Sequence, residues 1–422
     1  MPLLIFSKIY YLEPLQIHFN PTTFSLYQLN LSYIKLVGKP MAESKPQRLL
    51  SLDVMRGITI ACMILVNTPG SWSYLYAPLS HAAWNGLTPT DLIFPFFLFM
   101  VGLAMTFGLP KMQALPRKTA LFNLAKRGFL LFFIGYVIHM LPALISQGSQ
   151  WSFSSSRIPG VLQRIGIAYT LSGIMLLYLN PKQLFYTSIG ILLSYWGILY
   201  LASDPLTLEG NLIRTIDIAI FGETHIWAMQ GIAGKVPFDP EGLLSTLPAI
   251  VTVLIGVWSG WIVRSSDEIY KKLAHLGIYG SILGIIGVCW GFGFPINKAL
   301  WSSTYVLVTG GIAMMFLALL TWVIDLKGYK KWTSPFVVYG SNALFAYCLA
   351  EFWVGAMWTF VKVPDGHGNW VVAYLGVFNH WLEPIVGSYP GSLLFAIFHV
   401  VVIWAILVPL YRKKIFIKIY LI

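Results

Sequence analysis

Apolar residues run along this chain in long blocks that are separated by short polar segments. Each block is about 18–22 residues long, the length an α-helix needs to cross a hydrocarbon core at 1.5 Å per residue. Backbone polar groups in lipid must be satisfied within the segment, so these blocks predict helices rather than barrel strands. They lie at residues 50–67, 91–109, 128–145, 160–179, 184–202, 243–263, 275–293, 303–324, 335–358 and 392–410. The pattern predicts an all-α, polytopic transmembrane helical bundle of about ten spans.

Basic residues between the blocks alternate between rich and poor loops. Sixteen lie in one set: Lys111, Arg117, Lys118, Lys126, Arg127, Lys182, Arg264, Lys271, Lys272, Lys327, Lys330, Lys331, Arg412, Lys413, Lys414 and Lys418. Five lie in the other: Arg157, Arg214, Lys235, Lys298 and Lys362. The positive-inside rule places the rich set, and with it both termini, in the cytoplasm. The other loops then face outward, and the longest of them, 203–242, holds most of the outward acidic residues.

Composition supports the membrane interpretation and limits the chemistry. Hydrophobic residues form 57% of the 422 and charged residues 10%, whereas soluble domains average about 45–50% and about 25%. In this setting the net charge of +12 indicates basic cytoplasmic loops and contact with anionic lipid rather than a nucleic-acid partner. Cys62, Cys289 and Cys348 all lie inside apolar blocks, so we expect neither a disulfide framework nor a metal site.

The first 40 residues differ from the rest of the chain. They are mixed in polarity, rich in aromatic residues and interrupted by proline, without the long apolar core of a signal peptide. Met41 opens MAESKPQRLLSLDVMRG, a sequence suited to a natural start. We therefore expect residues 1–40 to be an N-terminal extension and residues 41–422 to form a single transmembrane domain.

Three residues near the outward ends of the first two spans could carry chemistry. His81 stands in an aromatic loop, where a neutral imidazole can act as a base or a nucleophile, although a structural loop histidine is the simpler interpretation. Asp91 could orient that imidazole, and it also fits the third position of a capping box in Thr88-Pro89-Thr90-Asp91. Asn67 could donate to an oxyanion or could only cap its helix.

Ionisable residues inside the spans are costly and indicate partners or function. Asp53 and Arg56 lie one turn apart and can form a purely structural pair. Arg157 and Arg164 are seven residues apart, with Gln163 between them, and so share a helix face. Such a basic stripe suits an anionic ligand or a buried carboxylate such as Glu351. Three further polar positions, each compatible with an interhelical hydrogen bond, are His139, Asn342 and His399.

Common nucleotide and zinc motifs do not occur. The sequence contains no GxxxxGK[ST] loop, no GxGxxG opening a strand–helix unit and no HExxH. A nucleotide-driven pump and a zinc protease are therefore disfavoured.

Six distinctive stretches lie between about residue 48 and the end of the chain: RLLSLDVMRGITIACMILVN, HAAWNGLTPTDLIFPFFLFMVG, RIPGVLQRIGIAY, FDPEGLLST, PINKALWSSTYVL and YRKKIFIKI. Through them the chain resembles the heparan-α-glucosaminide N-acetyltransferase family, including its bacterial members. The resemblance implies a multi-pass membrane enzyme that takes acetyl from cytoplasmic acetyl-CoA and delivers it to the amine of a glucosamine unit on the far side. The family's active-site histidine corresponds to His81, its asparagine ending the first span to Asn67, and its RIPGVLQR arginine to Arg157.

The chain also departs from the family. Large lysosomal relatives carry an additional luminal domain and an additional span, for which we expect no counterpart in this chain. They also have a His-Glu pair in the ninth span, where this sequence has Ala350 and Glu351. A role for a second histidine at that position is therefore not carried over.

The resemblance implies a mechanism with several alternatives. Coenzyme A, a large anion, would bind near cytoplasmic basic residues, for which the candidates are Lys111, Lys126, Arg127 and Lys182. His81 would either accept the acetyl group or deprotonate the amine, and Asn67 would stabilise the oxyanion. We expect a bacterial cytoplasmic-membrane protein, compatible with a homodimer, that uses no metal. A sugar or amphiphile transporter is the alternative, as is an acyltransferase with another acyl group or acceptor.

Overall fold

The computed structural model describes residues 49–231, 234–366 and 368–417. The predicted extension at residues 1–40 lies outside these ranges, so its prediction stays untested. All described residues belong to one unit, Ser44–Ile422.

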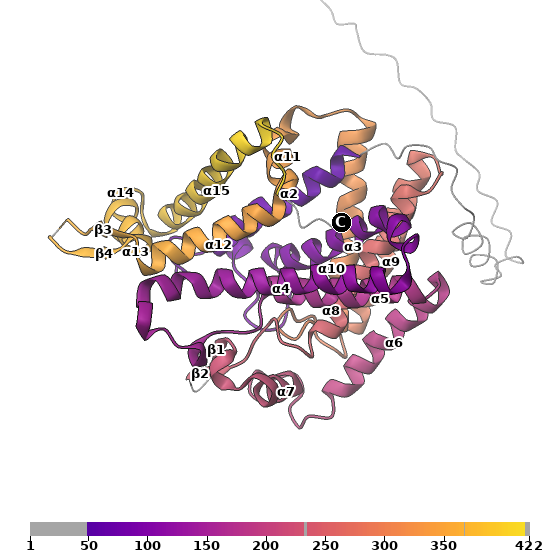
Figure 1. Ribbon diagram of the computed structural model, residues 1–422, viewed down its shortest axis with the longest axis horizontal. Helices are drawn as coiled ribbons and strands as arrows, with labels where there is room; N and C mark the ends of the chain where they lie inside the picture. The colour runs from indigo at the N-terminus through magenta and orange to yellow at the C-terminus, as the bar shows by residue number, and fades with distance from the viewer. Residues whose placement is uncertain (1–48, 232–233, 367, 418–422) are drawn as a thin grey trace, which may run out of the picture. The chain divides into compact units, whose positions relative to one another are not determined.

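The described chain is mainly helical (Figure 1). Its longer helices are α2 (Leu50–Asn67), α3 (Ile93–Gln113), α4 (Arg117–Gln147), α5 (Val161–Tyr178), α6 (Pro181–Leu199), α7 (Leu212–Phe221), α8 (Thr246–Arg264), α9 (Ile269–Trp290), α10 (Ser303–Leu320), α11 (Ser334–Ser341), α12 (Ala343–Thr359) and α15 (Ser388–Arg412). The short ones are α13 (Ala373–Gly376) and α14 (Glu383–Val386). Two antiparallel hairpins are formed by β1 (Ala228–Gly231) with β2 (Gly234–Pro237), and by β3 (Lys362–Pro364) with β4 (Trp370–Val372).

The helical membrane bundle predicted from the sequence is confirmed. Among the described residues, eight helices are long and apolar enough to cross a membrane, or nine when α11 and α12 count as one broken span. The fifth predicted span, 184–202, is the one left outside this set, and it corresponds to α6. This helix is less apolar, since Lys182 and Gln183 lie in its first turn, and it stays a predicted span.

The predicted span 335–358 is not one straight helix. α11 and α12 meet at a bend of 75°, because Asn342 leaves helical geometry with φ −128° and ψ 40°. The Asn342 side chain binds the carbonyl of Ile415 at 3.0 Å and accepts from the amide of Ile417 at 2.8 Å. The polar position recognised in the sequence therefore connects a helix break to the C-terminal segment.

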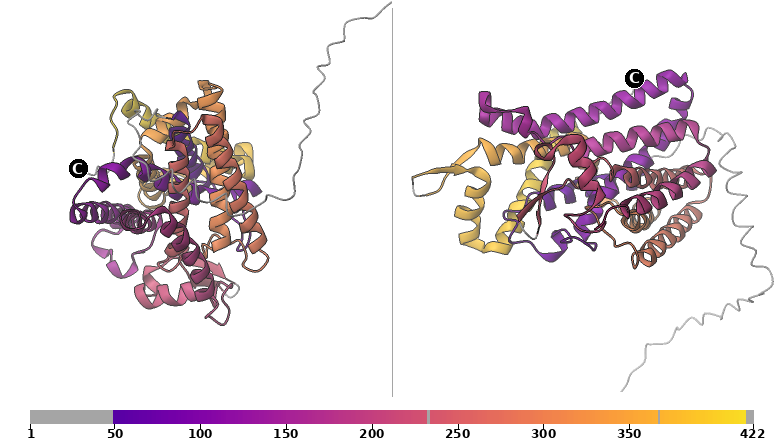
Figure 2. Two further views of the ribbon diagram at one scale, coloured as in Figure 1. Left: turned by 90° about the vertical axis from the view of Figure 1, so that its right-hand side faces the viewer. Right: turned by 90° about the horizontal axis from the view of Figure 1, so that it is seen from below.

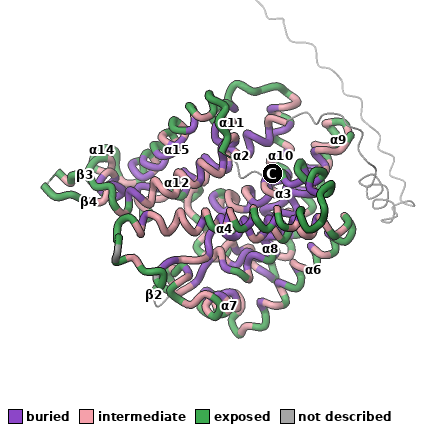
Figure 3. Tube along the Cα trace, in the orientation of Figure 1, coloured by how far each residue is buried: buried purple, intermediate pink, exposed green. Residues whose placement is uncertain are grey.

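The core of the bundle surrounds α8. In the most apolar stretch of α8, 83% of the residues are buried, compared with 22% in α4 and 17% in α9. Figure 3 shows the exposed residues along α4. α8 packs closely on α3 through glycines: a Cβ at Gly256 would lie 1.9 Å from the carbonyl oxygen of Phe99, and one at Gly102 would lie 1.8 Å from that of Val253. Small residues of this kind let membrane helices approach each other.

α4 lies alongside α5 and α12, while α9 packs on α10 (Figures 1 and 2). The outer faces of α4 and α9 expose large apolar side chains, among them Phe129, Phe133, Ile282 and Ile285. Such faces are suited to lipid. The polar groups gather instead in the segments that connect α2 to α3, α4 to α5, α6 to α8 and α9 to α10.

Candidate active site

His81 is held by the start of the helix that follows it. Thr88 and Asp91 form a capping box at the 3₁₀ turn Pro89–Leu92, which leads into α3. Oδ2 of Asp91 accepts from the amides of Ala82 and Thr88, both at 3.1 Å, and from the Thr88 hydroxyl at 3.0 Å. Its other oxygen lies 2.6 Å from Nδ1 of His81. Asp91 therefore makes both contacts that the sequence analysis weighed, the helix cap and the imidazole.

The segment before α10 is tied to the His81 loop. The amide of Gly86 donates to the carbonyl of Ile296 at 2.8 Å, and Nδ2 of Asn297 donates to Oδ1 of Asn85 at 3.1 Å. The hydroxyl of Tyr305, in the first turn of α10, donates to the backbone carbonyl of Asp91 at 2.6 Å. These bonds bring two loops that are more than 200 residues apart into one site.

Lys298 lies against His81 as a result. Its Nζ is 3.0 Å from Nδ1 and 3.3 Å from Nε2 of the imidazole, and 3.7 Å from Oδ1 of Asp91. Burial lowers the pKa of Lys298 below its ordinary value, while the charges of Asp91 and Glu241 oppose that shift. Because Asp91 is a hydrogen-bond acceptor at Nδ1, it favours the tautomer with the proton there and the lone pair on Nε2.

A cavity of about 160 Å³ adjoins these groups. Its polar lining residues are Asn67, His81, Thr90, Glu241 and Lys298. The remaining lining side chains are apolar or aromatic: Met63, Val66, Ile93, Phe94, Phe97, Val161, Leu162, Ile165 and Tyr347. Asn67, the last residue of α2, thus borders the same cavity as His81. A mostly apolar cavity with a few convergent polar groups is typical of a small-molecule site.

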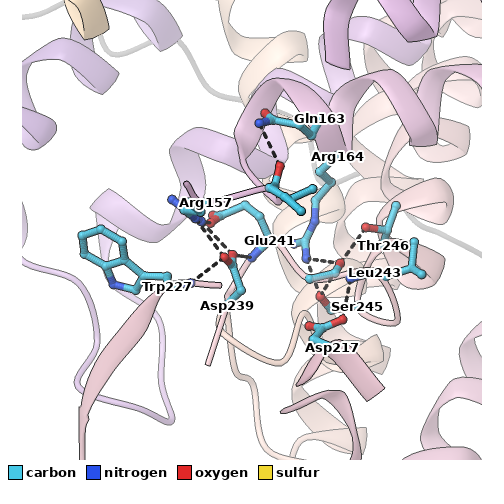
Figure 4. A network of polar contacts seen from close by, with 12 residues as sticks. Arg157, Gln163, Arg164, Asp217, Trp227, Asp239, Glu241, Leu243, Ser245 and Thr246 are labelled. Atoms are coloured by element: carbon cyan, nitrogen blue, oxygen red, sulfur yellow. Dashed lines mark hydrogen bonds and ion pairs between the residues drawn. The ribbon is translucent and has the colours of Figure 1, made fainter. Parts of the chain in front are cut away.

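Arg157 does not line the cavity itself but binds Glu241, which does. Its Nε and Nη2 bind the two oxygens of Asp239 at 2.8 and 2.7 Å, and Nη2 also binds Oε2 of Glu241 at 2.5 Å (Figure 4). Asp239, which is completely buried, also accepts from the amides of Trp227 and Glu241 at 2.9 and 3.0 Å. Burial alone would raise the pKa of Asp239, but Arg157 holds that pKa below its usual range. The carboxylate partners of Arg157 are therefore in the 203–242 loop, and not at Glu351.

Arg164 and Gln163 support the same loop from α5. The guanidinium of Arg164 donates to the carbonyl of Gly242 at 3.2 Å and to the hydroxyl of Ser245, and it lies 4.8 Å from the ring centre of Trp301. Nε2 of Gln163 donates to the carbonyl of Ile158 at 3.1 Å. Arg157 and Arg164 thus contact neighbouring parts of one loop (Figure 4), which fixes the position of Glu241.

The other predicted site residues lie elsewhere. Arg56 binds Asp53 at 3.4 Å and the carbonyl of Gly340 at 3.2 Å. Asp53 borders a second cavity, of about 280 Å³, at the opposite end of α2. Glu351 lies in α12 with its Oε2 3.9 Å from Nε2 of His139 in α4. None of these residues borders the His81 cavity.

Lys298, Asp239 and Glu241 belong to the cluster around the His81 cavity although the sequence alone identifies them only as loop charges. Each lies in a stretch that carries the family resemblance, since FDPEGLLST contains Asp239 and Glu241 and PINKALWSSTYVL contains Lys298. The charged residues of these stretches are the sequence signal that points to them.

The arrangement defines a class: a helical membrane protein with a carboxylate-oriented imidazole in an apolar cavity. Residues 48–288, more than half of the chain, match the family described as "Heparan-alpha-glucosaminide N-acetyltransferase, catalytic". The chain therefore belongs to that family. Similar curated proteins are the heparan-alpha-glucosaminide N-acetyltransferases of Homo sapiens and Mus musculus, each 30% identical over 72% of this chain. The chain spans about half the length of these relatives, 52% and 53% respectively.

Proposed function

We propose that this protein is a transmembrane N-acetyltransferase that moves acetyl from acetyl-CoA to the amine of a glucosamine-type sugar. The observation that carries the proposal is the contact between His81 and Asp91 in a cavity that Asn67 and Lys298 also border. Membership of the family supports the reaction class. His81, Asn67 and Asp91 are the proposed catalytic group.

Asp91 leaves the lone pair of His81 on Nε2, and two routes use it. In the first, Nε2 attacks the thioester, the C–S bond breaks, and the amine then displaces the imidazole. In the second, the amine itself attacks the thioester, and Nε2 takes a proton from the amine during the attack. In both, the amine loses one proton and the departing thiolate gains one. Asn67 and Lys298 would stabilise the oxyanion formed at the carbonyl.

The distribution of charge supports a direction for the reaction. If the lysine-rich loops are cytoplasmic, His81 lies near the outward side. Acetyl-CoA would then bind from the cytoplasm, with Lys111, Lys126, Arg127 and Lys182 as candidate contacts for its phosphates. The acceptor would arrive from outside. Because the sequence also resembles bacterial members of the family, we expect the protein to lie in a bacterial cytoplasmic membrane.

Transfer of radiolabelled acetyl from acetyl-CoA to glucosamine, in detergent-purified protein, tests the proposal. We expect labelled product from the wild type and from the control variant His380→Ala, because His380 is exposed and does not line the cavity. We expect none above background from His81→Ala. If the wild type labels no amino sugar but proteoliposomes transport one, the transporter alternative replaces this proposal.

A further inference from the structure

We propose that Glu241 binds the ammonium group of the acceptor in the His81 cavity and thereby selects amines over neutral sugars. This inference rests on the proposed function and deepens it by assigning the acceptor's charged group to one residue. Glu241 is the acidic residue among the cavity-lining side chains of the described chain.

The position of Glu241 is fixed from two sides. Its Oε2 accepts from Nη2 of Arg157 at 2.5 Å, and its backbone amide donates to Oδ1 of Asp239 at 3.0 Å. Its side chain is only 13% exposed. A carboxylate that is held in this way loses little conformational entropy when a ligand binds, so it is pre-organised for a cation.

The carboxylate of Glu241 shares its cation with Asp239. Both Nε and Nη2 of Arg157 bind Asp239, and only Nη2 also binds Oε2 of Glu241. The nearby cations Arg164 and Lys298 add positive charge, but their hydrogen bonds go to the Gly242–Ser245 segment and to His81. The second carboxylate oxygen of Glu241 is therefore the one that a cationic ligand in the cavity would bind, in a charge-assisted hydrogen bond.

An amino sugar supplies such a charge, because an amine is mostly protonated at neutral pH. A neutral sugar would offer the Glu241 carboxylate only an uncharged donor, and an anion would be repelled by it. The cavity also contains His81, so an amine held at Glu241 is near the imidazole that takes part in transfer. The contact is ionic, and the bound ammonium must pass one proton to Glu241 or to solvent before its nitrogen has a lone pair for the attack. The neutral amine then loses its second proton during transfer, as described above.

The first test measures glucosamine binding to the full-length protein by calorimetry, together with the KM values for glucosamine and for acetyl-CoA. Glu241→Gln keeps the side-chain length and an oxygen for Arg157. We expect it to weaken glucosamine binding and to raise that KM by roughly tenfold or more, since hydrogen bonds to charged groups contribute about 1.5–3 kcal/mol. The KM for acetyl-CoA should change less than twofold. The matched control, Glu223→Gln, alters an exposed residue of the same loop and should change neither value.

A competition experiment on the wild-type protein avoids any folding defect of the variant. The quaternary N-trimethyl derivative of glucosamine keeps the positive charge and cannot accept acetyl. We expect it to displace glucosamine, and we expect glucose at the same concentration to have no effect.

The outcomes separate this inference from the proposed function. Unchanged glucosamine affinity in Glu241→Gln, or equal competition by glucose, overturns the role of Glu241 even if acetyl transfer is observed. A parallel rise in both KM values with a lower melting temperature also overturns it, in favour of a structural role. A wild type that binds glucosamine through Glu241 but transfers no acetyl overturns the proposed function alone.

Discussion

The two ends of α2 use polar side chains differently. At its start, the side chains satisfy backbone groups: Asp325 accepts from the amides of Leu50 and Ser51 at 2.9 and 3.2 Å, and Arg56 donates to the carbonyl of Gly340. At its end, roughly 25 Å away at 1.5 Å per residue, Asn67 borders a cavity where charged side chains contact one another.

The difference distinguishes scaffold from site. A charge bound to helix ends replaces missing backbone hydrogen bonds, and its loss affects stability. The groups His81, Lys298 and Glu241 each pair with other side chains while also bordering a cavity. Their loss should affect the reaction more than the fold. Substitutions at the cavity should therefore lower kcat strongly, and substitutions that affect only the scaffold should change stability and leave kcat nearly unchanged.

Asp91→Asn should give the largest loss of activity. Three donors converge on Oδ2 of Asp91, so the asparagine oxygen would take that place and its amide nitrogen would face Nδ1 of His81. The imidazole would then carry its proton on Nε2 and lose its lone pair there. We expect kcat to fall by up to roughly 10⁴-fold, as in the Ser-His-Asp triad when its aspartate is replaced by asparagine. Steady-state kinetics would measure it, and a fall of less than tenfold would contradict the orienting role.

Lys298→Met should have the next largest effect. The variant keeps most of the apolar stem but removes the charge that lies 3.3 Å from Nε2 of His81. Loss of one oxyanion-stabilising donor typically lowers kcat by about 10²-fold. Lys362→Met, in the β3 strand, is the matched control and should retain wild-type kcat. Equal kcat in both variants would remove Lys298 from the catalytic group.

Asp217→Asn should change how stability depends on pH. Asp217 is buried beside the Glu241 loop, accepts from the amide of Leu243 at 2.9 Å, and has its pKa raised to about 6 by burial. The folded state thus prefers the protonated carboxyl, so the wild type loses stability as pH rises from about 4 to about 6. Above that range we expect the variant to gain on the order of 2 kcal/mol relative to the wild type. Melting temperatures at pH 4 and pH 8 measure the difference, and parallel curves would contradict it.

Asp325→Ala should have the smallest effect and leave the chemistry intact. It removes the acceptor for two amides at the start of α2, a change comparable to the loss of a helix cap, which costs about 1 kcal/mol. We expect a melting temperature lower by a few degrees and kcat within twofold of wild type. A large fall in kcat at unchanged stability would mean that the Asp53 end also belongs to the site.

Hydropathy predicted the membrane helices well but could not predict their breaks. The span 335–358 appears continuous in its apolar pattern, yet Asn342 divides it because its side chain binds the backbone of Ile415 and Ile417. That contact joins segments more than 70 residues apart. Local apolarity contains no information about it.

The sequence by itself determined the class of fold and the family, and it predicted His81, Asn67 and Asp91 as a group. These depend on local properties: the length of apolar blocks, the capping pattern Thr88–Asp91 and short characteristic stretches. The tertiary structure decided which charges join them. Lys298 and Glu241 reach the His81 cavity only because α8, α10 and their preceding loops pack against α3 and α5. Contacts between distant segments depend on packing, and one sequence read along its length does not specify them.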